Sequence, residues 1–278
     1  MGRKINDKLI EKMTTGDLNP FLNYLKTEKK RLRLEVRRKG KCFVYYKKCK
    51  ILDLGLRSSH VDKKYFKNKE EPNNIREKII NKPEEYFEET IKIIDLWLLN
   101  HPKEEFETQQ NIAFFNQDKN DRFLILDMEY NFSQEGVKIT NRVKQAGFDL
   151  LGIERKTGKI VFFEVKKGLK ALTNKAGIKS HINDFEECLF GINKEIFRTD
   201  LISDIENIIS DKMKLGLIEK NNLTKNISVD NVDLIFVFEP VDGEKDNYPE
   251  IFEKEYKKAN TNKTFRTIYV KKENYKLF

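Results

Sequence analysis

The stretch from Phe148 to Lys167, FDLLGIERKTGKIVFFEVKK, predicts two β-strands joined by a tight turn at residues 156–158. The second strand, from Ile160 to Lys166, is apolar until it ends in Glu-Val-Lys. Because side chains alternate between the two faces of a strand, Glu164 and Lys166 project from the same face. The strand therefore places a carboxylate and an ammonium side by side at its end.

These charges need partners, because burying an ionised side chain without one is costly. The first strand contributes a third charged group, Asp149, in otherwise apolar surroundings. A metal ion together with a phosphate group would satisfy all three charges. Asp149, Glu164 and Lys166 are therefore the candidate reactive residues.

The 278-residue chain is long enough for one large domain or two modest ones. No apolar run approaches the length that spans a bilayer, and the first residues lack an apolar signal core, so we expect a cytoplasmic protein without a membrane partner. The three cysteines and three histidines show no zinc-ligand spacing.

The positive charge is concentrated near the N-terminus. Residues 1–70 hold 21 Lys and Arg against 8 Asp and Glu, a balance of +13, whereas the rest of the chain carries −4. Such asymmetry favours a polyanionic partner, and we expect nucleic acid. The alternative is that the lysines only keep the protein soluble.

A basic hairpin is predicted within this region. The segments RLRLEVRR and KCFVYYKK flank a turn at Lys39-Gly40, and a third strand, KILDLGL, follows. Apolar and mostly basic residues alternate along the first segment, which predicts a half-buried antiparallel strand with one basic face. That face can be a solvated outer surface or a nucleic-acid contact, and the candidate contacts are Arg31, Arg33, Arg37, Arg38, Lys47 and Lys48.

The remaining segments predict an α/β domain with a mixed sheet flanked by helices. We expect a basic, β-rich N-terminal domain over residues 1–82 and a second domain over residues 83–278. In the second domain, Ser180 is the expected N-cap of a helix. The expected helices lie at 83–99, 103–116, 180–190 and 194–218, and the strands at 122–132, 148–154, 160–166, 232–238 and 264–270.

An acidic strand residue, Asp149, followed by Glu164-Val165-Lys166 at the end of the next strand resembles the PD-(D/E)xK nuclease superfamily. The order helix, three strands, helix, strand over residues 103–240 is also similar to its restriction-endonuclease-like fold. One departure is that Gly147-Phe148, and no proline, precedes Asp149. The resemblance implies hydrolysis of phosphodiester bonds, with DNA as the expected substrate and RNA as an alternative.

The chemistry of these residues agrees with that reading. Mg²⁺ or Mn²⁺ prefers oxygen ligands, which the carboxylates of Asp149 and Glu164 and the Val165 carbonyl can provide. Lys166 can orient or deprotonate the attacking water, because the pKa of a lysine shifts readily when it is desolvated near cations. The structural alternative is that Glu164 and Lys166 merely form a salt bridge.

Further acids and a histidine are candidates for supporting roles. Glu129 shares a face with Asp127 on the preceding strand and is favoured over it, and Glu107 on the helix before is a weaker candidate. The resemblance implies that the helix after Lys166 contributes a polar residue, for which His181 is the candidate.

Two other functions remain open. The chain can be a catalytically inactive nucleic-acid-binding protein on a nuclease fold, or an effector subunit whose N-terminal sheet senses a ligand. Cutting two strands would normally require a homodimer, but the sequence carries no dimerisation pattern. A role in restriction, defence or repair is the expected context.

Overall fold

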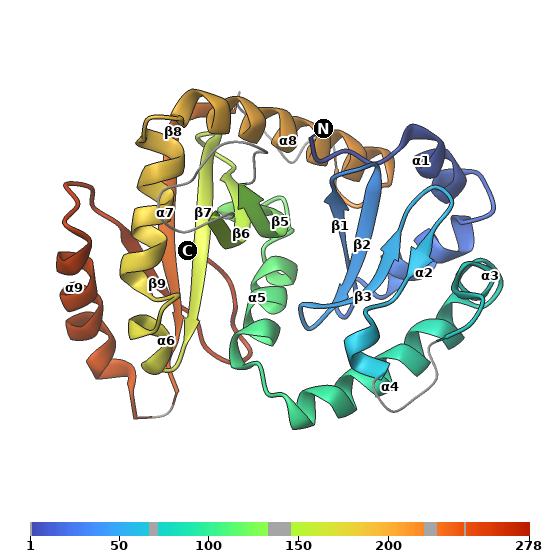
Figure 1. Ribbon diagram of the computed structural model, residues 1–278, viewed down its shortest axis with the longest axis horizontal. Helices are drawn as coiled ribbons and strands as arrows, with labels where there is room; N and C mark the ends of the chain where they lie inside the picture. The colour runs from blue at the N-terminus through green and yellow to red at the C-terminus, as the bar shows by residue number, and fades with distance from the viewer. Residues whose placement is uncertain (1, 67–71, 133–145, 220–226, 242) are drawn as a thin grey trace. The chain divides into compact units, whose positions relative to one another are not determined.

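The computed structural model describes residues 2–66, 72–132, 146–219, 227–241 and 243–278. The protein is a mixed α/β chain with a four-stranded antiparallel sheet, a five-stranded mixed sheet and helices (Figure 1). It divides into two compact units. The first contains Met1–Gln110 and Ser203–Lys220, and the second contains Asn111–Ile202 and Asn221–Phe278.

The first unit is built on the predicted hairpin. Its sheet has the order β1-β2-β3-β4, with every neighbouring pair antiparallel. The three predicted strands are confirmed, and the described residues between β3 and α4 hold a short strand and two short helices. The elements are α1 Asp7–Thr14, α2 Asn19–Thr27, β1 Arg33–Arg37, β2 Lys41–Tyr46, β3 Cys49–Leu54, β4 Ser59–His60, η1 Lys63–Phe66, α3 Ile75–Asn81 and α4 Pro83–Asn100.

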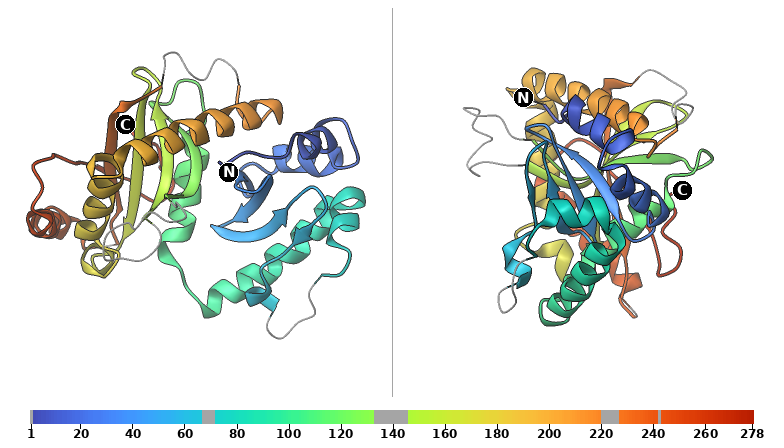
Figure 2. Two further views of the ribbon diagram at one scale, coloured as in Figure 1. Left: turned by 45° about the horizontal axis from the view of Figure 1, so that its top comes forward. Right: turned by 90° about the vertical axis from the view of Figure 1, so that its right-hand side faces the viewer.

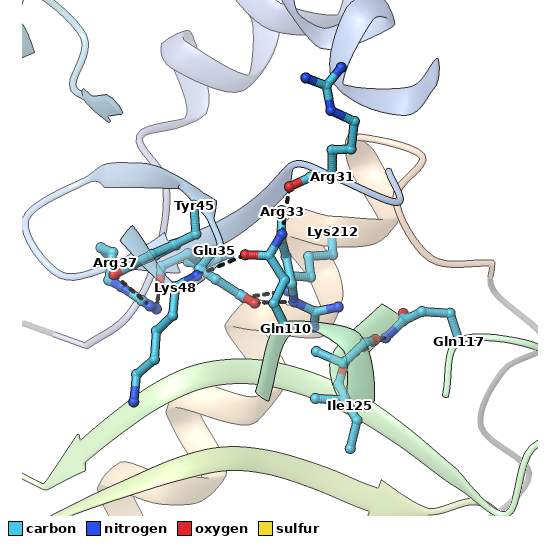
Figure 3. A network of polar contacts seen from close by, with 12 residues as sticks. Arg31, Arg33, Glu35, Arg37, Tyr45, Lys48, Gln110, Gln117, Ile125 and Lys212 are labelled. Carbon is cyan, nitrogen blue, oxygen red and sulfur yellow. Dashed lines mark hydrogen bonds and ion pairs between the residues drawn. The ribbon is translucent and has the colours of Figure 1, made fainter. Parts of the chain in front are cut away.

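Strand β1 is covered on both faces, so the prediction of a half-buried strand is wrong, and the alternative in which its basic face is a solvated outer surface does not hold. Glu35 is completely buried and receives Arg33 on one side and Lys212 on the other, with Lys212 Nζ 2.6 Å from Glu35 Oε2 (Figure 3). Arg37 is 8% exposed and donates to the Tyr45 hydroxyl at 3.2 Å. The alternation seen in the sequence therefore separates an apolar layer from a buried ionic layer.

The division into units does not coincide with the predicted boundary after residue 82, because α4 packs on the N-terminal sheet (Figure 2). The Tyr86 hydroxyl donates to the Ile51 carbonyl of β3 at 2.9 Å, and the Phe87 ring stacks on Phe21 of α2.

Residues 203–220 also belong to the first unit. Asp204 and Asp211 accept hydrogen bonds from the backbone amides of Arg3 and Ile5, each at 2.6 Å. These bonds hold the N-terminal segment against residues that lie about two hundred positions further along the chain.

The second unit contains the five-stranded sheet, in the order β5-β6-β7-β8-β9. Pairs β5–β6 and β6–β7 are antiparallel, whereas β7–β8 and β8–β9 are parallel. The predicted order of helix, three strands, helix and strand is confirmed. The elements are α5 Glu104–Phe115, β5 Phe123–Phe132, β6 Ala146–Glu154, β7 Lys159–Lys167, α6 Lys170–Thr173, α7 Ile178–Phe190, α8 Lys194–Lys214, β8 Ser228–Glu239, η3 Lys245–Asn247, α9 Tyr248–Ala259 and β9 Arg266–Tyr269. The division between the units falls within α5 and within α8.

Helix α7 packs against the sheet through aromatic side chains. Phe185 meets Phe148 of β6 and Phe162 of β7 edge to face. The helix begins at Ile178 with Gly177 as N-cap, so the prediction that Ser180 is the N-cap is wrong. The Gly177 carbonyl accepts the Ser180 amide at 3.1 Å, which places Ser180 inside the first turn.

We predict that replacing Lys212 destabilises the first unit. Lys212→Ala leaves the buried Glu35 carboxylate without one of its two cationic partners, and breaking a buried ion pair in this way costs about 3 kcal/mol of unfolding free energy. Urea denaturation measures the change. Lys214→Ala, which removes an exposed lysine from the same helix, should change stability by about 0.5 kcal/mol or less. Equal losses in the two variants would contradict the stabilising role of the Glu35 cluster.

Candidate active site

Strands β6 and β7 bring Asp149 and Glu164 to the same place in the sheet. Their antiparallel register pairs Leu150 with Phe163, so the next position along each strand sets Asp149 opposite Glu164. The two strands are joined there by a side chain, because Asp149 Oδ2 accepts the backbone amide of Val165 at 2.9 Å. Asp149 itself is half-buried.

Glu164 is the centre of a buried ionic cluster. Lys166 Nζ lies 2.7 Å from Glu164 Oε1, and His181 Nε2 of helix α7 lies 2.8 Å from the same oxygen. Glu164 is 2% exposed, Lys166 3% and His181 9%. Glu164 and Lys166 therefore share a strand face as predicted, and His181 of helix α7 contacts Glu164 from outside the strand.

The charges in this cluster determine its protonation. Burial raises the pKa of Glu164, but the nearby His181 and Lys166 outweigh it and lower the pKa to about 2. Burial lowers the pKa of His181, but the Glu164 carboxylate outweighs burial and the net pKa is raised. Glu164 is thus an ionised carboxylate at neutral pH, compensated by the two basic groups around it.

One oxygen of this carboxylate has no partner. Glu164 Oε2 is buried and makes no hydrogen bond to the described residues. Such an atom is costly unless something else binds it. An oxygen-preferring cation would satisfy it, and Asp149 lies opposite on the adjacent strand.

The donors present suit Mg²⁺ or Mn²⁺ held by few protein ligands. Within the described residues no group of three or more His, Cys, Asp or Glu side chains is arranged to hold a metal ion. Mg²⁺ is commonly bound by one or two carboxylates, with waters and a substrate phosphate completing its shell. Asp149 of β6 and Glu164 of β7 fit that pattern. The carbonyl of Val165, the residue after Glu164, is a third candidate oxygen ligand.

Glu129 continues the row of acids into β5. Met128 pairs with Leu150 and Tyr130 with Phe148, so Glu129 stands between these pairs, where Asp149 is its counterpart. Its φ of +58° is unusual for a residue with a side chain, and it interrupts the regular alternation of the strand. Glu129 is half-buried, whereas Asp127 is fully buried and pairs with Leu151.

Sequence reasoning missed Glu239, which supports the strand that carries the cluster. It is paired with Lys167 at the ends of the parallel strands β8 and β7, and Lys167 Nζ lies 3.1 Å from Glu239 Oε1. The Tyr275 hydroxyl donates to the same oxygen at 3.4 Å. The only sequence signal was that Glu239 closes an apolar strand, as Glu164 nearly does.

The six basic residues predicted to contact nucleic acid all lie in the first unit, and none is fully exposed. Each has a partner within that unit. Arg31 pairs with Glu88, Arg33 with Glu35, Arg37 with Tyr45, Arg38 with Asp204 and Lys47 with Asp95, while the Lys48 ammonium lies over the Phe106 ring. Their role in binding nucleic acid stays a prediction.

Comparisons with models of protein families, with curated proteins and with solved structures found no significant match. Among the described residues, no helix combines the length and the apolar composition needed to cross a bilayer.

We predict that stability of the metal-free protein falls with rising pH through the titration of His181. Because its pKa is raised in the folded state, the stabilisation is complete below the unfolded value of about 6.5 and is lost as pH rises through the folded value. Urea midpoints measured across this range should fall in the wild type and fall less in His181→Gln. Parallel pH profiles for the two proteins would refute the assignment.

Proposed function

We propose that the protein is a divalent-metal-dependent nuclease that hydrolyses phosphodiester bonds, with DNA as the expected substrate. The observation that carries the proposal is the buried Glu164–Lys166–His181 cluster at the end of β7, with Asp149 opposite it on β6. The order of the elements around it is the one that resembles the PD-(D/E)xK nucleases. Perturbed titratable groups beside each other favour a reactive site.

Each residue has a distinct task in this proposal. Asp149 and Glu164 would hold Mg²⁺ or Mn²⁺, and the Val165 carbonyl would add a ligand. The bound cation supplies charge neutralisation on the phosphodiester. His181 and Lys166 both contact Glu164 Oε1, which leaves Oε2 as the oxygen for the cation.

Lys166 is the candidate for handling the attacking water. Its ammonium is almost completely buried and lies 2.7 Å from the Glu164 carboxylate. Lys166 Nζ would donate a hydrogen bond that orients the attacking water, and it would accept the proton of that water only after releasing its own. Asp149 and Glu129 are half-buried, whereas Glu164 and Lys166 are buried, so we propose that the phosphodiester approaches past Asp149 and Glu129.

A catalytically inactive binding protein is the second candidate. The observation that favours it is the direct pairing of Lys166 with Glu164 at 2.7 Å, which a purely structural ion pair would also show. Buried pairs of this kind are found where no chemistry occurs. Activity measurements on matched variants separate the two functions.

We predict that Asp149→Asn and Lys166→Ala each reduce Mg²⁺-dependent plasmid cleavage by about 10²-fold or more, because a metal ligand or a proton acceptor is lost. Nucleic-acid binding should persist in both variants. Gel electrophoresis of the products measures cleavage, and a filter-binding assay measures binding. Glu129→Gln should have a smaller effect.

Matched controls lie elsewhere in the same unit. Asp233→Asn removes a carboxylate of β8 that pairs with Lys159 and Arg266, and Lys156→Ala removes an exposed lysine from the turn between β6 and β7. Both should retain most of the cleavage activity. Cleavage that is unchanged in Asp149→Asn and Lys166→Ala would reject the proposed site, and absence of cleavage by the wild type with either metal would favour the binding protein.

A further inference from the structure

The segment that follows β7 contains lysines and no acidic residue. Residues 168–183, here called the α6–α7 corner, contain no Asp or Glu and carry Lys170, Lys175 and Lys179. All three lysines are exposed. Lys170 and Lys179 make no ion pair with the described residues, unlike Lys78 and Lys82, which pair with nearby glutamates. Lys170 and Lys179 therefore present positive charge that no carboxylate of the described residues compensates.

Helix α7 starts within this corner without a side-chain cap. Its N-cap is Gly177, which provides no side-chain hydrogen bond, and its first turn holds no acidic residue. The first backbone amides of the helix that find an acceptor are those of Ser180 and His181, which donate to the Gly177 carbonyl. The amides of Ile178 and Lys179 donate to no described residue. Free amides and the helix dipole make such a start attractive to anions.

A buried side chain in the same turn also has an unused polar atom. His181 is nine-tenths buried, and its Nδ1 has no hydrogen-bond partner among the described residues. Because side chains on a helix lean toward its N-terminus, we expect the ring to lie toward the start of α7. With Nε2 directed at Glu164, Nδ1 is the ring atom left for a ligand.

The corner adjoins the candidate active site. Helix α6 follows directly on the end of β7 (Figure 1), and the contact of His181 with Glu164 ties the first turn of α7 to the same strand. An anion held at this turn would therefore lie beside Glu164 and Lys166.

We propose that the α6–α7 corner binds backbone phosphates of a nucleic acid next to the phosphodiester that is cleaved. The amides of Ile178 and Lys179 and the Nδ1 atom of His181 contact one phosphate, and Lys170 and Lys179 contact its neighbours along the strand. The substrate is consequently a polymer and not a mononucleotide. The inference rests on the proposed nuclease function for the position of the cleaved bond, but phosphate binding itself needs neither metal nor cleavage.

Binding of fluorescein-labelled duplex DNA to the 278-residue, metal-free protein tests the proposal across a series of KCl concentrations. Each phosphate contact contributes about 0.9 to the slope of log K against log salt. The double variant Lys170→Ala/Lys179→Ala should therefore lower the slope by about 2. The matched control is Lys119→Ala/Lys156→Ala, which removes the same charge from exposed positions at the opposite end of the sheet and should keep the wild-type slope.

A second measurement reports on His181 directly. Long-range ¹H–¹⁵N correlation spectra, with the His181 signals identified by their absence in His181→Gln, should show Nδ1 shifting as inorganic phosphate is added to the wild type. The shift should require more phosphate in the Lys170→Ala/Lys179→Ala variant. A wild-type salt slope in that variant, an equal loss in the control, or an unmoved Nδ1 signal would each overturn the proposal.

The two proposals fail separately. A lowered salt slope without any Mg²⁺- or Mn²⁺-dependent cleavage would support the phosphate site and reject the nuclease function. Cleavage with an unchanged slope would support the nuclease and reject the phosphate site.

Discussion

The burial of one carboxylate, that of Glu164, constrains the whole second unit. An ionised group with so little exposure is tolerated only when opposite charges and hydrogen-bond donors surround it. Lys166 supplies one from the same strand, and His181 supplies the other from a separate helix. The position of α7 over β6 and β7 is therefore fixed by charge as well as by the aromatic contacts of Phe185.

The first unit uses the same principle for a different purpose. Glu35 is as deeply buried as Glu164, and its partners Arg33 and Lys212 come from β1 and from the far end of α8. Both of its oxygens are engaged, whereas Glu164 Oε2 finds no partner in the part of the chain that the structure describes. A buried carboxylate whose two oxygens both have partners suits a structural role. A buried carboxylate with one unpartnered oxygen suits the binding of a ligand. Arg33, one of the candidate nucleic-acid contacts, is thus paired with a buried carboxylate inside the first unit.

The sequence predicted features that depend on local pattern. Apolar runs located β6 and β7, and the two-residue period placed Glu164 and Lys166 on one face. Pattern could not tell which faces are covered, because the cover of β1 includes Lys212, far along the chain. The left-handed conformation of Glu129 was equally hidden, because residue preference does not predict a positive φ for a glutamate. The proximity of His181 to Glu164 could be anticipated only through the resemblance to a family, because helix packing decides which histidine approaches a strand.

The first unit is assembled from two separate pieces of the chain, and this affects how the protein can be divided. A fragment ending at Gln110 would lack Ser203–Lys220, so the amides of Arg3 and Ile5 would lose the aspartates that accept them and Glu35 would lose Lys212. Neither unit corresponds to one uninterrupted stretch of the gene. Recombination that exchanges one continuous segment of the gene could therefore not transfer either unit alone. The N-terminal sheet and the candidate active site would be inherited together.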